Sequence, residues 1–376
     1  MIHSRILITG GAGFIGSAIV RKLLAKYHCH VLTLDKLTYA GSLSNLSEVI
    51  PHTFHQFVES DVEDYDSVRQ IIADFRPDGI IHLAAETHVD RSIAGPATFI
   101  NTNVLGTLSL LEAAFSFWST LSNEQRAKFR FLHVSTDEVY GDLGPSGEFS
   151  EESRYKPNSP YSASKAAADH LVRAWNMTYG LPTLVSNCTN NYGPYQFPEK
   201  LIPFMIYNAL NGESLPIYGD GLHVRDWLYV DDHANALIKI LTNGIVGEVY
   251  CIGGNCEISN LEVVESLTSI LDAQFPNSPN TPHAQLLRHV SDRPGHDRRY
   301  AVNTDKINHE LGWTPQETFS SGLEKTVCWY LANTDWSSAI IHEASLKLGC
   351  HDLERKADSS PRWTRTGKGA NKRGPS

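Results

Sequence analysis

The chain has 376 residues, of which 41% are hydrophobic, and its formal net charge is −10. This size and apolar content allow a large buried core, in one domain or two interlocked ones, whereas the acidic balance argues against a nucleic-acid-binding body. The six cysteines form no CxxC pair, which argues against a zinc site or a disulfide scaffold. Since the sequence also shows no leader peptide and no apolar run long enough to span a bilayer, we expect a cytoplasmic protein.

Short apolar runs rich in β-branched residues alternate with helical patterns through the first half of the chain. The predicted strands are residues 5–9, 30–34, 53–58, 79–85, 129–136 and 183–190. The predicted helices are residues 17–26, 64–75, 97–118 and 161–180. Such alternation indicates right-handed crossovers and a parallel sheet that helices cover on both faces. The sequence therefore predicts an α/β fold with a Rossmann-type doubly wound parallel sheet.

The amino-acid composition changes after residue 190, where Pro and Gly become frequent. We expect the Rossmann domain to comprise 1–189 plus 226–255, and a smaller C-terminal substrate lobe to comprise 190–225 plus 256–335. Residues 336–376 would form a C-terminal extension. Its last 26 residues contain seven Lys or Arg and three Asp or Glu and lack periodicity, so we expect its end to be disordered.

Three glycines mark the junction between the first strand and the first helix. Gly10, Gly13 and Gly16 follow the strand directly, and such glycines permit a tight turn, close approach to a pyrophosphate and close helix–strand packing. The helix N-terminus then favours an anion. Asp35 lies 19 residues after Gly16 at the end of the second strand, where its carboxylate would accept both ribose hydroxyls and favour NAD over NADP. The adjacent Lys36 weakens this preference slightly, and a turn glycine cluster with a solvated aspartate is the alternative.

Tyr161 and Lys165 are four positions apart on a predicted helix, so they share one face. A phenol normally ionises near pH ~10. A neighbouring ammonium and a positive nicotinamide ring would both lower that pKa, making the tyrosine a usable base for a sugar hydroxyl during hydride transfer. A solvated helix pair is the alternative, and the preceding dinucleotide fold makes it less favoured.

These motifs resemble the extended short-chain dehydrogenase/reductase family over residues 4–330. The resemblance rests on TGGAGFIG at 9–16, HLAA at 82–85 and YSASK at 161–165. It implies that the cofactor also contacts a wider set of residues, namely Phe14, Ile15, Lys36, Leu37, Thr38, Asp61, Val62, Leu83, Ala84, Ala85, Thr102, Tyr161, Lys165 and Asn191. Taken alone, Asp61 would more often cap a helix.

Thr136, Asp137 and Glu138 end the predicted strand at 129–136. Hydride transfer needs only a hydroxyl at this place, whereas elimination of water needs a base for a carbon-bound proton and an acid for the leaving hydroxyl. Two carboxyl groups in different environments can divide these roles. Both can reach one site only if the strand has ended by Asp137, because strand neighbours point to opposite faces. Two exposed turn acids are the alternative.

The segment STDEVYG at 135–141 closely resembles the dTDP-glucose 4,6-dehydratase family. This resemblance implies NAD-dependent oxidation at carbon 4 of a nucleotide sugar, water elimination across carbons 5 and 6, and hydride return to carbon 6. It places the substrate at Thr87, Asn190, Lys200, Leu201, Pro216, Ile217, Tyr218, Arg225, Asn260, Asp292, Arg293, Pro294, Gly295 and His296. One departure is Thr87, where the family leads us to expect Ser; the hydroxyl is retained.

The resemblance also implies a homodimer through the helices at about 97–118 and 161–179, whose apolar residues exceed one core stripe. No histidine spacing supports a metal site. A nucleotide-sugar 4-epimerase and a UDP-glucose 4,6-dehydratase are the nearest alternative enzymes, and an NAD-sensing scaffold is the alternative outside enzymes. An epimerase would not need Asp137 and Glu138, and a scaffold would often have lost Tyr161 or Lys165.

Overall fold

The computed structural model describes residues 4–27, 29–292 and 295–348. Seven parallel strands form its central sheet, in the order β10-β6-β5-β4-β1-β2-β3. Their bounds are β1 Arg5–Thr9, β2 His30–Asp35, β3 His55–Glu59, β4 Gly79–His82, β5 Arg130–Thr136, β6 Thr183–Cys188 and β10 Val249–Ile252. The predicted doubly wound parallel sheet is confirmed.

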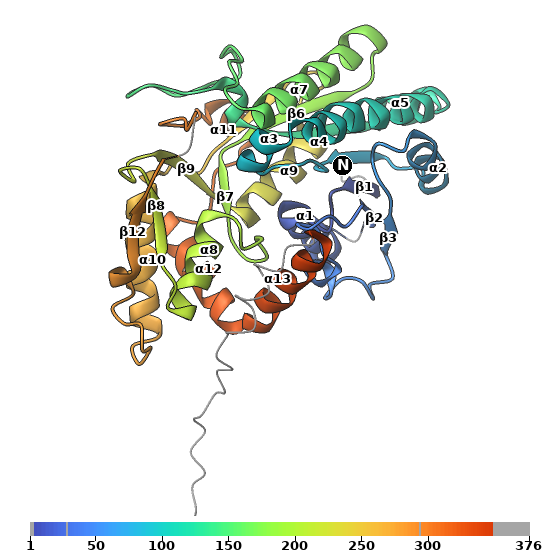
Figure 1. The fold of residues 1–376 in the computed structure, drawn as a ribbon. Coiled ribbons are helices and arrows are strands. Elements are labelled where there is room, and N and C mark those ends of the chain that lie inside the picture. The colour runs from blue at the N-terminus through green and yellow to red at the C-terminus, as the bar shows by residue number, and fades with distance from the viewer. Residues whose placement is uncertain (1–3, 28, 293–294, 349–376) are drawn as a thin grey trace, which may run out of the picture.

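Helices cover both faces of this sheet and bury its apolar strands (Figure 1). One face packs against α1 (Phe14–Lys26), α9 (Val230–Asn243) and α11 (Asp305–Leu311). The other face packs against α2 (Tyr65–Phe75), α5 (Gly106–Ser119) and α7 (Pro160–Tyr179). Strands β1 and β4 carry fully buried Leu7 and Ile80 toward the second layer and Ile8 and Ile81 toward the first, the period-two alternation expected of a strand covered on both sides.

The helix expected over 97–118 contains a local change of winding. Helix α4 (Pro96–Phe99) continues into the π-helical turn η2 (Ile100–Leu105) and then into α5. Within this turn, the side chain of Asn103 donates to the carbonyl of Glu86 at 3.0 Å and to Ser164 Oγ at 2.8 Å. Such π turns are frequent at functional sites, and this one faces the start of α7.

The smaller lobe has its own core between two short sheets and several helices. One sheet has the order β11-β9-β7 and the other joins β12 to β8. The strands are β7 Asn190–Tyr192, β8 Leu215–Tyr218, β9 Val224–Tyr229, β11 Glu257–Ser259 and β12 Leu287–Val290. The helices that pack on them are α8 Leu201–Asn211, α10 Asn260–Gln274 and α12 Phe319–Ala332. The remaining elements are η1 Leu43–Leu46, α3 Val89–Ala94, α6 Asn123–Lys128, η3 Asp137–Tyr140 and η4 His283–Leu286.

Residues 226–255, which we expected to return to the Rossmann domain, contain strands of two different sheets. Strand β9 pairs with β7 and β11 rather than with the central sheet, whereas α9 and β10 lie with the central sheet. The division of the chain into domains stays a prediction. No helix of the described part is long and apolar enough to cross a membrane.

The last described helix, α13 (Thr334–Leu348), returns from the smaller lobe to the first strands (Figure 1). Trp336 donates to Asn45 Oδ1 at 3.2 Å, and Ser42 Oγ donates to Glu343 Oε2 at 2.7 Å. The sequence predicted only an extension here. The disorder expected at the end of the chain falls on residues 349–376, outside the described residues.

Candidate active site

The glycine turn before α1 brings three chain segments too close together for any side chain. Gly10 has φ +70°, and a Cβ there would lie 2.7 Å from the backbone nitrogen of Ala84. A Cβ at Gly16 would lie 2.2 Å from the carbonyl oxygen of Gly10. Helix α1 begins without a side-chain cap and without an acidic residue in its first turn, so its N-terminal amides can bind an anion. These features fit a pyrophosphate-binding turn.

Asp35 ends β2 with its carboxylate beside this turn. It accepts the N–H of Ala12 at 3.0 Å and the N–H of Leu37 at 2.9 Å, and burial raises its pKa. Lys36 points elsewhere, because its ammonium donates to Asp61 and Thr102, each at 3.2 Å. The ammonium of Lys36 is bonded to other groups, so the carboxylate of Asp35 remains directed at the cleft.

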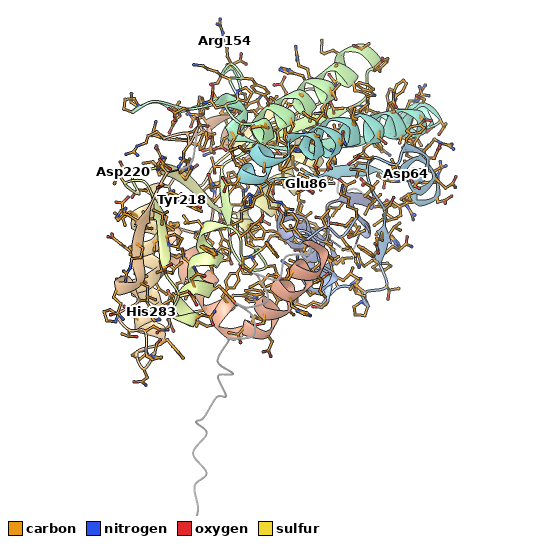
Figure 2. All side chains as sticks on the ribbon, in the orientation of Figure 1. Asp64, Glu86, Arg154, Tyr218, Asp220 and His283 are labelled. Carbon is orange, nitrogen blue, oxygen red and sulfur yellow. The ribbon has the colours of Figure 1, made fainter. Side chains whose placement is uncertain are left out.

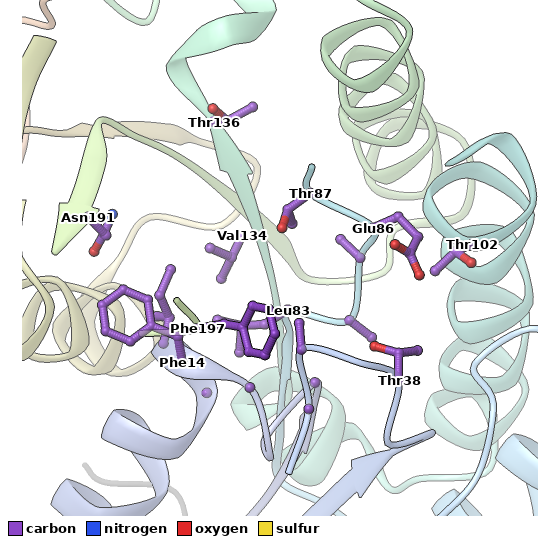
Figure 3. A pocket seen from close by; sticks show the side chains of 18 of the residues that line it. Phe14, Thr38, Leu83, Glu86, Thr87, Thr102, Val134, Thr136, Asn191 and Phe197 are labelled. Atoms are coloured by element: carbon purple, nitrogen blue, oxygen red, sulfur yellow. The ribbon is translucent and has the colours of Figure 1, made fainter. Parts of the chain in front are cut away.

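A cleft of about 300 Å³, the first cleft, opens over the carboxyl ends of the strands. Figure 3 shows Phe14, Thr38 and Leu83 on its wall. The predicted cofactor residues that line it are Gly10, Gly13, Phe14, Ile15, Gly16, Asp35, Lys36, Thr38, Val62, Leu83, Ala84, Ala85, Thr102, Tyr161, Lys165 and Asn191. Leu37 and Asp61 of the predicted set are not part of the wall, although each contacts a residue that is.

The two acids that follow β5 lie in a turn rather than in the strand. Strand β5 ends at Thr136, and η3 begins at Asp137, so the condition for both acids to reach one site is met. Asp137 is 2% exposed, and its Oδ2 has no hydrogen-bond partner in the described part of the chain. Burial, reinforced by the charge of Glu138, raises the pKa of Asp137 well above its usual range. Asp137 is therefore held as an acid able to give a proton.

Tyr161 lies at the start of α7 and is 8% exposed. Burial raises its pKa well above the usual value, the charge of Glu138 adds to this, and a hydrogen bond with Thr136 opposes it. The lowered pKa that the Tyr161–Lys165 spacing led us to expect is therefore wrong for the chain alone. The lysine ammonium is bonded to other groups, and the desolvation of the phenol dominates.

Lys165 is buried one turn further along α7. Its ammonium donates to the carbonyl of Val134 at 2.9 Å and lies 3.3 Å from Nε2 of His133. Burial lowers its pKa to about 8. Lys165 thus remains largely charged at neutral pH, at the wall of the first cleft.

A second cleft of about 460 Å³ lies between the first cleft and the smaller lobe. The residues shared by both walls are Thr87, Glu138, Asn190, Phe197, Glu199 and Lys200. The predicted substrate residues that line the second cleft are Thr87, Asn190, Lys200, Leu201, Pro216, Tyr218, Arg225, Asn260, Gly295 and His296. Figure 2 labels Tyr218 on β8, beside Asp220. Glu138 therefore stands where the two clefts meet.

Some predicted substrate residues are placed differently. Ile217 is 2% exposed in the core of the smaller lobe, because it alternates with Pro216 and Tyr218 along β8. Asp292 is not part of the cleft wall, and Arg293 and Pro294 lie outside the described residues. Two nitrogens of Arg225 donate to backbone carbonyls, Nη1 to Val224 and Nη2 to Asp297, each at 2.8 Å.

The fold brings His223 beside Asp292 and His296, which are far from it in sequence. His223 Nε2 lies 3.4 Å from Asp292 Oδ2, and His296 Nδ1 lies 2.7 Å from Asp292 Oδ1. These ligand-type atoms lie within 4.8 Å of one another. The sequence spacing had not suggested this grouping, which the hydrogen bond and the stacked rings, 3.7 Å apart, account for without an ion.

Several residues of the two walls were not singled out from the sequence. Glu86, Ser135, Cys188 and Gln196 line the first cleft, and Glu199 lines both. Glu199 lies 3.6 Å from Nε2 of His88 and accepts the hydroxyl of Tyr39 at 3.1 Å. Its sequence neighbours Lys200 and Leu201 were expected at the substrate, whereas no motif pointed to Glu199 itself.

The comparisons with known proteins agree with this geometry. Residues 7–326 match the family model described as GDP-mannose 4,6 dehydratase. The chain belongs to the GDP-mannose 4,6-dehydratase family. Within the family it is 55% identical to a dTDP-glucose 4,6-dehydratase of Shigella flexneri, over 88% of this chain and 94% of the relative. It is 53% identical to the dTDP-glucose 4,6-dehydratase of Neisseria meningitidis, over 93% of this chain and 98% of the relative.

Solved structures give the same grouping. The dTDP-glucose 4,6-dehydratase DesIV of Streptomyces venezuelae, with NAD bound, matches with a TM-score of 0.82 and 44% identity, over 89% of this chain and 99% of that one. A UDP-glucose 4-epimerase of Thermotoga maritima matches with a TM-score of 0.77 and 29% identity, over 88% and 99%. By sequence identity, this chain is therefore more similar to the dTDP-glucose dehydratase than to the epimerase.

Proposed function

We propose that the protein is a hydro-lyase that converts dTDP-glucose to dTDP-4-keto-6-deoxyglucose with NAD as its cofactor. The single observation that carries this proposal is the position of Glu138. It lines both clefts, beside the acid Asp137 and the phenol of Tyr161. An epimerase, whose reaction needs no elimination, would have no use for two acids at this junction.

The residues of the first cleft fit NAD. The amides at the start of α1 suit the pyrophosphate, the turn formed by Gly10 and Gly16 leaves room for it, and Asp35 suits the ribose hydroxyls. When bound, NAD supplies a hydride acceptor and donor, and a positive charge near the phenol. A single enzyme-bound NAD would serve each turnover, because the hydride returns to the same sugar.

Tyr161 would take the proton from the carbon-4 hydroxyl as the carbon is oxidised. Thr136 lies within hydrogen-bond reach of this phenol and can orient the reacting oxygen. Lys165 contributes a positive charge behind the phenol, and its pKa of about 8 leaves that charge in place at neutral pH. These three side chains come from β5 and α7, which are rigid elements on either side of the first cleft.

Elimination would fall to the two acids of η3. The ketone at carbon 4 acidifies the proton on carbon 5, which Glu138 would take. Asp137 would give its proton to the carbon-6 hydroxyl, so that water leaves, as its raised pKa permits. The remaining double bond then accepts the returning hydride at carbon 6 and a proton at carbon 5.

The second cleft would hold the nucleoside diphosphate. Lys200 and Asn190 line its junction with the first cleft and can meet the diphosphate, and Tyr218 is 38% exposed and can stack on the base. Both Nη atoms of Arg225 donate to backbone carbonyls, including those of Asp297 and Arg298, so it would support the 297–298 segment beside the ligand. The predicted substrate role of each residue remains part of this proposal.

The test is a labelling experiment with dTDP-glucose, with UDP-glucose run in parallel. Deuterium placed at carbon 4 should appear at carbon 6 of the 4-keto-6-deoxy product. Loss of the label to solvent would sink the internal return of hydride. Turnover to a galactose nucleotide without loss of water would favour the epimerase instead, and equal turnover of both nucleotides would refute a preference for thymidine.

We further propose that the protein is a homodimer formed through α5 and α7. Aromatic side chains cluster on the outer side of these helices: Phe115 lies 5.3 Å from Tyr179, and Trp175 lies 5.2 Å from Tyr179, between ring centroids. Tyr179 is 48% exposed and Met177 is 69% exposed. Such an apolar surface suits a second copy. Sedimentation at micromolar concentration should show a dimer, and a monomer alone would contradict it.

The free cysteines suit a reducing compartment, so we propose a cytoplasmic location. Cys29, Cys188 and Cys251 are buried thiols without disulfide partners. Fractionation of the producing cell should recover the protein with the cytoplasmic enzymes, and recovery from an oxidising compartment would contradict the proposal.

A further inference from the structure

Behind Lys165 lie a histidine and an aspartate to which the proposed reaction gives no role. Lys165 Nζ lies 3.3 Å from Nε2 of His133, and the same ring nitrogen lies 3.2 Å from Oδ1 of Asp169. The three residues are 4%, 1% and 3% exposed, respectively. They form a continuous buried row that runs from the wall of the first cleft into the interior between β5 and α7.

The carboxylate at the end of the row is held by a cage of donors. Asp169 Oδ2 accepts hydrogen bonds from Tyr155 at 2.8 Å, from Ser135 at 2.9 Å and from Asn187 at 3.2 Å. Three donors on one oxygen fix the orientation of the carboxylate. They leave Oδ1, which has no hydrogen-bond partner in the described part of the chain, facing the ring of His133.

One nitrogen of the neutral His133 ring lies beside both a cation and an anion. Burial, together with the charge of Lys165, lowers the pKa of His133 to about 4, so the ring is neutral at pH 7. Burial also lowers the pKa of Lys165, and Asp169 is the leading opposing influence. A buried ammonium is costly without a compensating charge, and Asp169 supplies that charge without touching Lys165.

We propose that Asp169, acting through His133, is a positioning residue that keeps Lys165 charged and directed at the carbonyl of Val134. The inference rests on the proposed function, in which Lys165 acts as an ammonium behind Tyr161. It gives His133 and Asp169 a role in the reaction and not only in stability. The row lies wholly inside the protein, so neither His133 nor Asp169 touches substrate or cofactor.

No other described group beside the row supplies a negative charge to Lys165. Burial raises the pKa of Cys188 to about 12 and lowers that of His82 well below its usual value, so both are neutral. The other titratable groups that face the row or the phenol are Asp137, Glu138, Tyr140, Tyr155 and Tyr161. Burial raises the pKa of each of these three tyrosines, and the two acids of η3 act on Tyr161.

The first experiment reads the charge of Lys165 directly. Holoprotein labelled with carbon-13 at the lysine ε-carbon is titrated by NMR, and the Lys165 signal is assigned by its loss in Lys165→Arg. Asp169→Asn keeps the shape of the side chain and should lower the midpoint of Lys165 by about one pH unit, since a compensating charge is removed. Asp169→Glu should restore much of the shift, and Asp66→Asn, at an exposed site of α2, should leave it unchanged.

The second experiment measures kcat against pH. The alkaline limb of Asp169→Asn should move to lower pH by the same interval, with about a fivefold loss at pH 8 and a smaller loss at pH 6.5. An unshifted lysine titration together with a uniform loss of activity would overturn the inference and leave Asp169 a structural residue. If Asp169→Asn does not fold, Asp169→Ser, which also removes the charge, serves instead, with the same expected direction. Wild-type protein without dehydratase turnover would refute the proposed function, whereas the lysine titration would still decide this inference.

Discussion

The hydroxyl of Thr136 donates a hydrogen bond to Oδ1 of Asp137 at 3.3 Å. The hydroxyl oxygen of Thr136 also accepts the backbone N–H of Glu138 at 3.3 Å and bonds the phenol of Tyr161. One side chain at the end of β5 therefore joins the oxidising phenol to the turn that carries both acids. Oxidation and elimination share an anchor, so the sugar can remain in one place through both steps.

Replacing both acids should separate the two steps. In Asp137→Asn combined with Glu138→Gln, elimination should fall by about 10²-fold or more, as expected when general acid–base groups are lost. The phenol, Lys165 and Thr136 are untouched, so carbon-4 oxidation should persist and NADH absorbance should accumulate on adding dTDP-glucose. Unchanged product formation by this variant would remove the acids from the mechanism.

Much of this arrangement could be predicted from the sequence, because its causes are local. Alternating apolar strands and helices define the doubly wound sheet. The glycines at 10, 13 and 16 mark a turn whose close contacts leave little room for a Cβ. Tyr161 and Lys165 share a helix face by spacing alone. For both acids to reach one site, the strand had to end by Asp137, and β5 does end at Thr136.

The remainder depends on packing between distant segments. The raised pKa of Tyr161 comes from burial and from Glu138, which no helix spacing reveals. Ile217 falls in the core because of which face β8 presents. Glu199 becomes part of both clefts only when the segment before α8 folds against Tyr39. The row from Lys165 to Asp169 forms only when α7 packs on β5 so that His133 contacts both residues.

Three buried histidines should make the protein less stable in mild acid. Burial lowers the pKa of His133 to about 4, that of His233 to about 3, and that of His82 well below 6.5. Between pH 6.5 and about 4 the unfolded chain binds protons that the folded chain does not. The free energy of unfolding should therefore fall as pH falls, by at most about 1.4 kcal/mol per pH unit for each histidine.

Urea unfolding at pH 7, 6 and 5 measures this slope. His133→Gln removes one titrating group and should flatten it, whereas substitution of His30, an exposed residue of β2, should not. A slope as steep in His133→Gln as in the wild type would show that this ring titrates alike in both states.

Substituting Gly16 by alanine should weaken cofactor binding. The new Cβ would lie 2.2 Å from the carbonyl oxygen of Gly10, so the turn must open and the start of α1 must move. Gly95→Ala is the matched control, because a Cβ there meets only the carbonyl of Arg91, at 3.9 Å. NAD affinity measured by calorimetry should fall at least about tenfold in Gly16→Ala, a loss of about 1.4 kcal/mol. Equal affinities in the two variants would contradict the assignment of this turn.

Lys347 of α13 should help to retain NAD. Its ammonium donates to the carbonyls of Thr38 at 3.2 Å and Gly41 at 3.3 Å, and both residues line the first cleft. Lys347→Ala should loosen this loop and speed NAD dissociation about fivefold, since partly exposed hydrogen bonds contribute about 1 kcal/mol. Because Lys347 itself lines neither cleft, kcat at saturating NAD should stay unchanged. Lys325→Ala on α12, where the lysine pairs with Glu317 at the surface, is the control, and stopped-flow displacement of bound NAD is the measurement. Dissociation rates that match in the two variants would show that α13 packs against the loop without holding the cofactor.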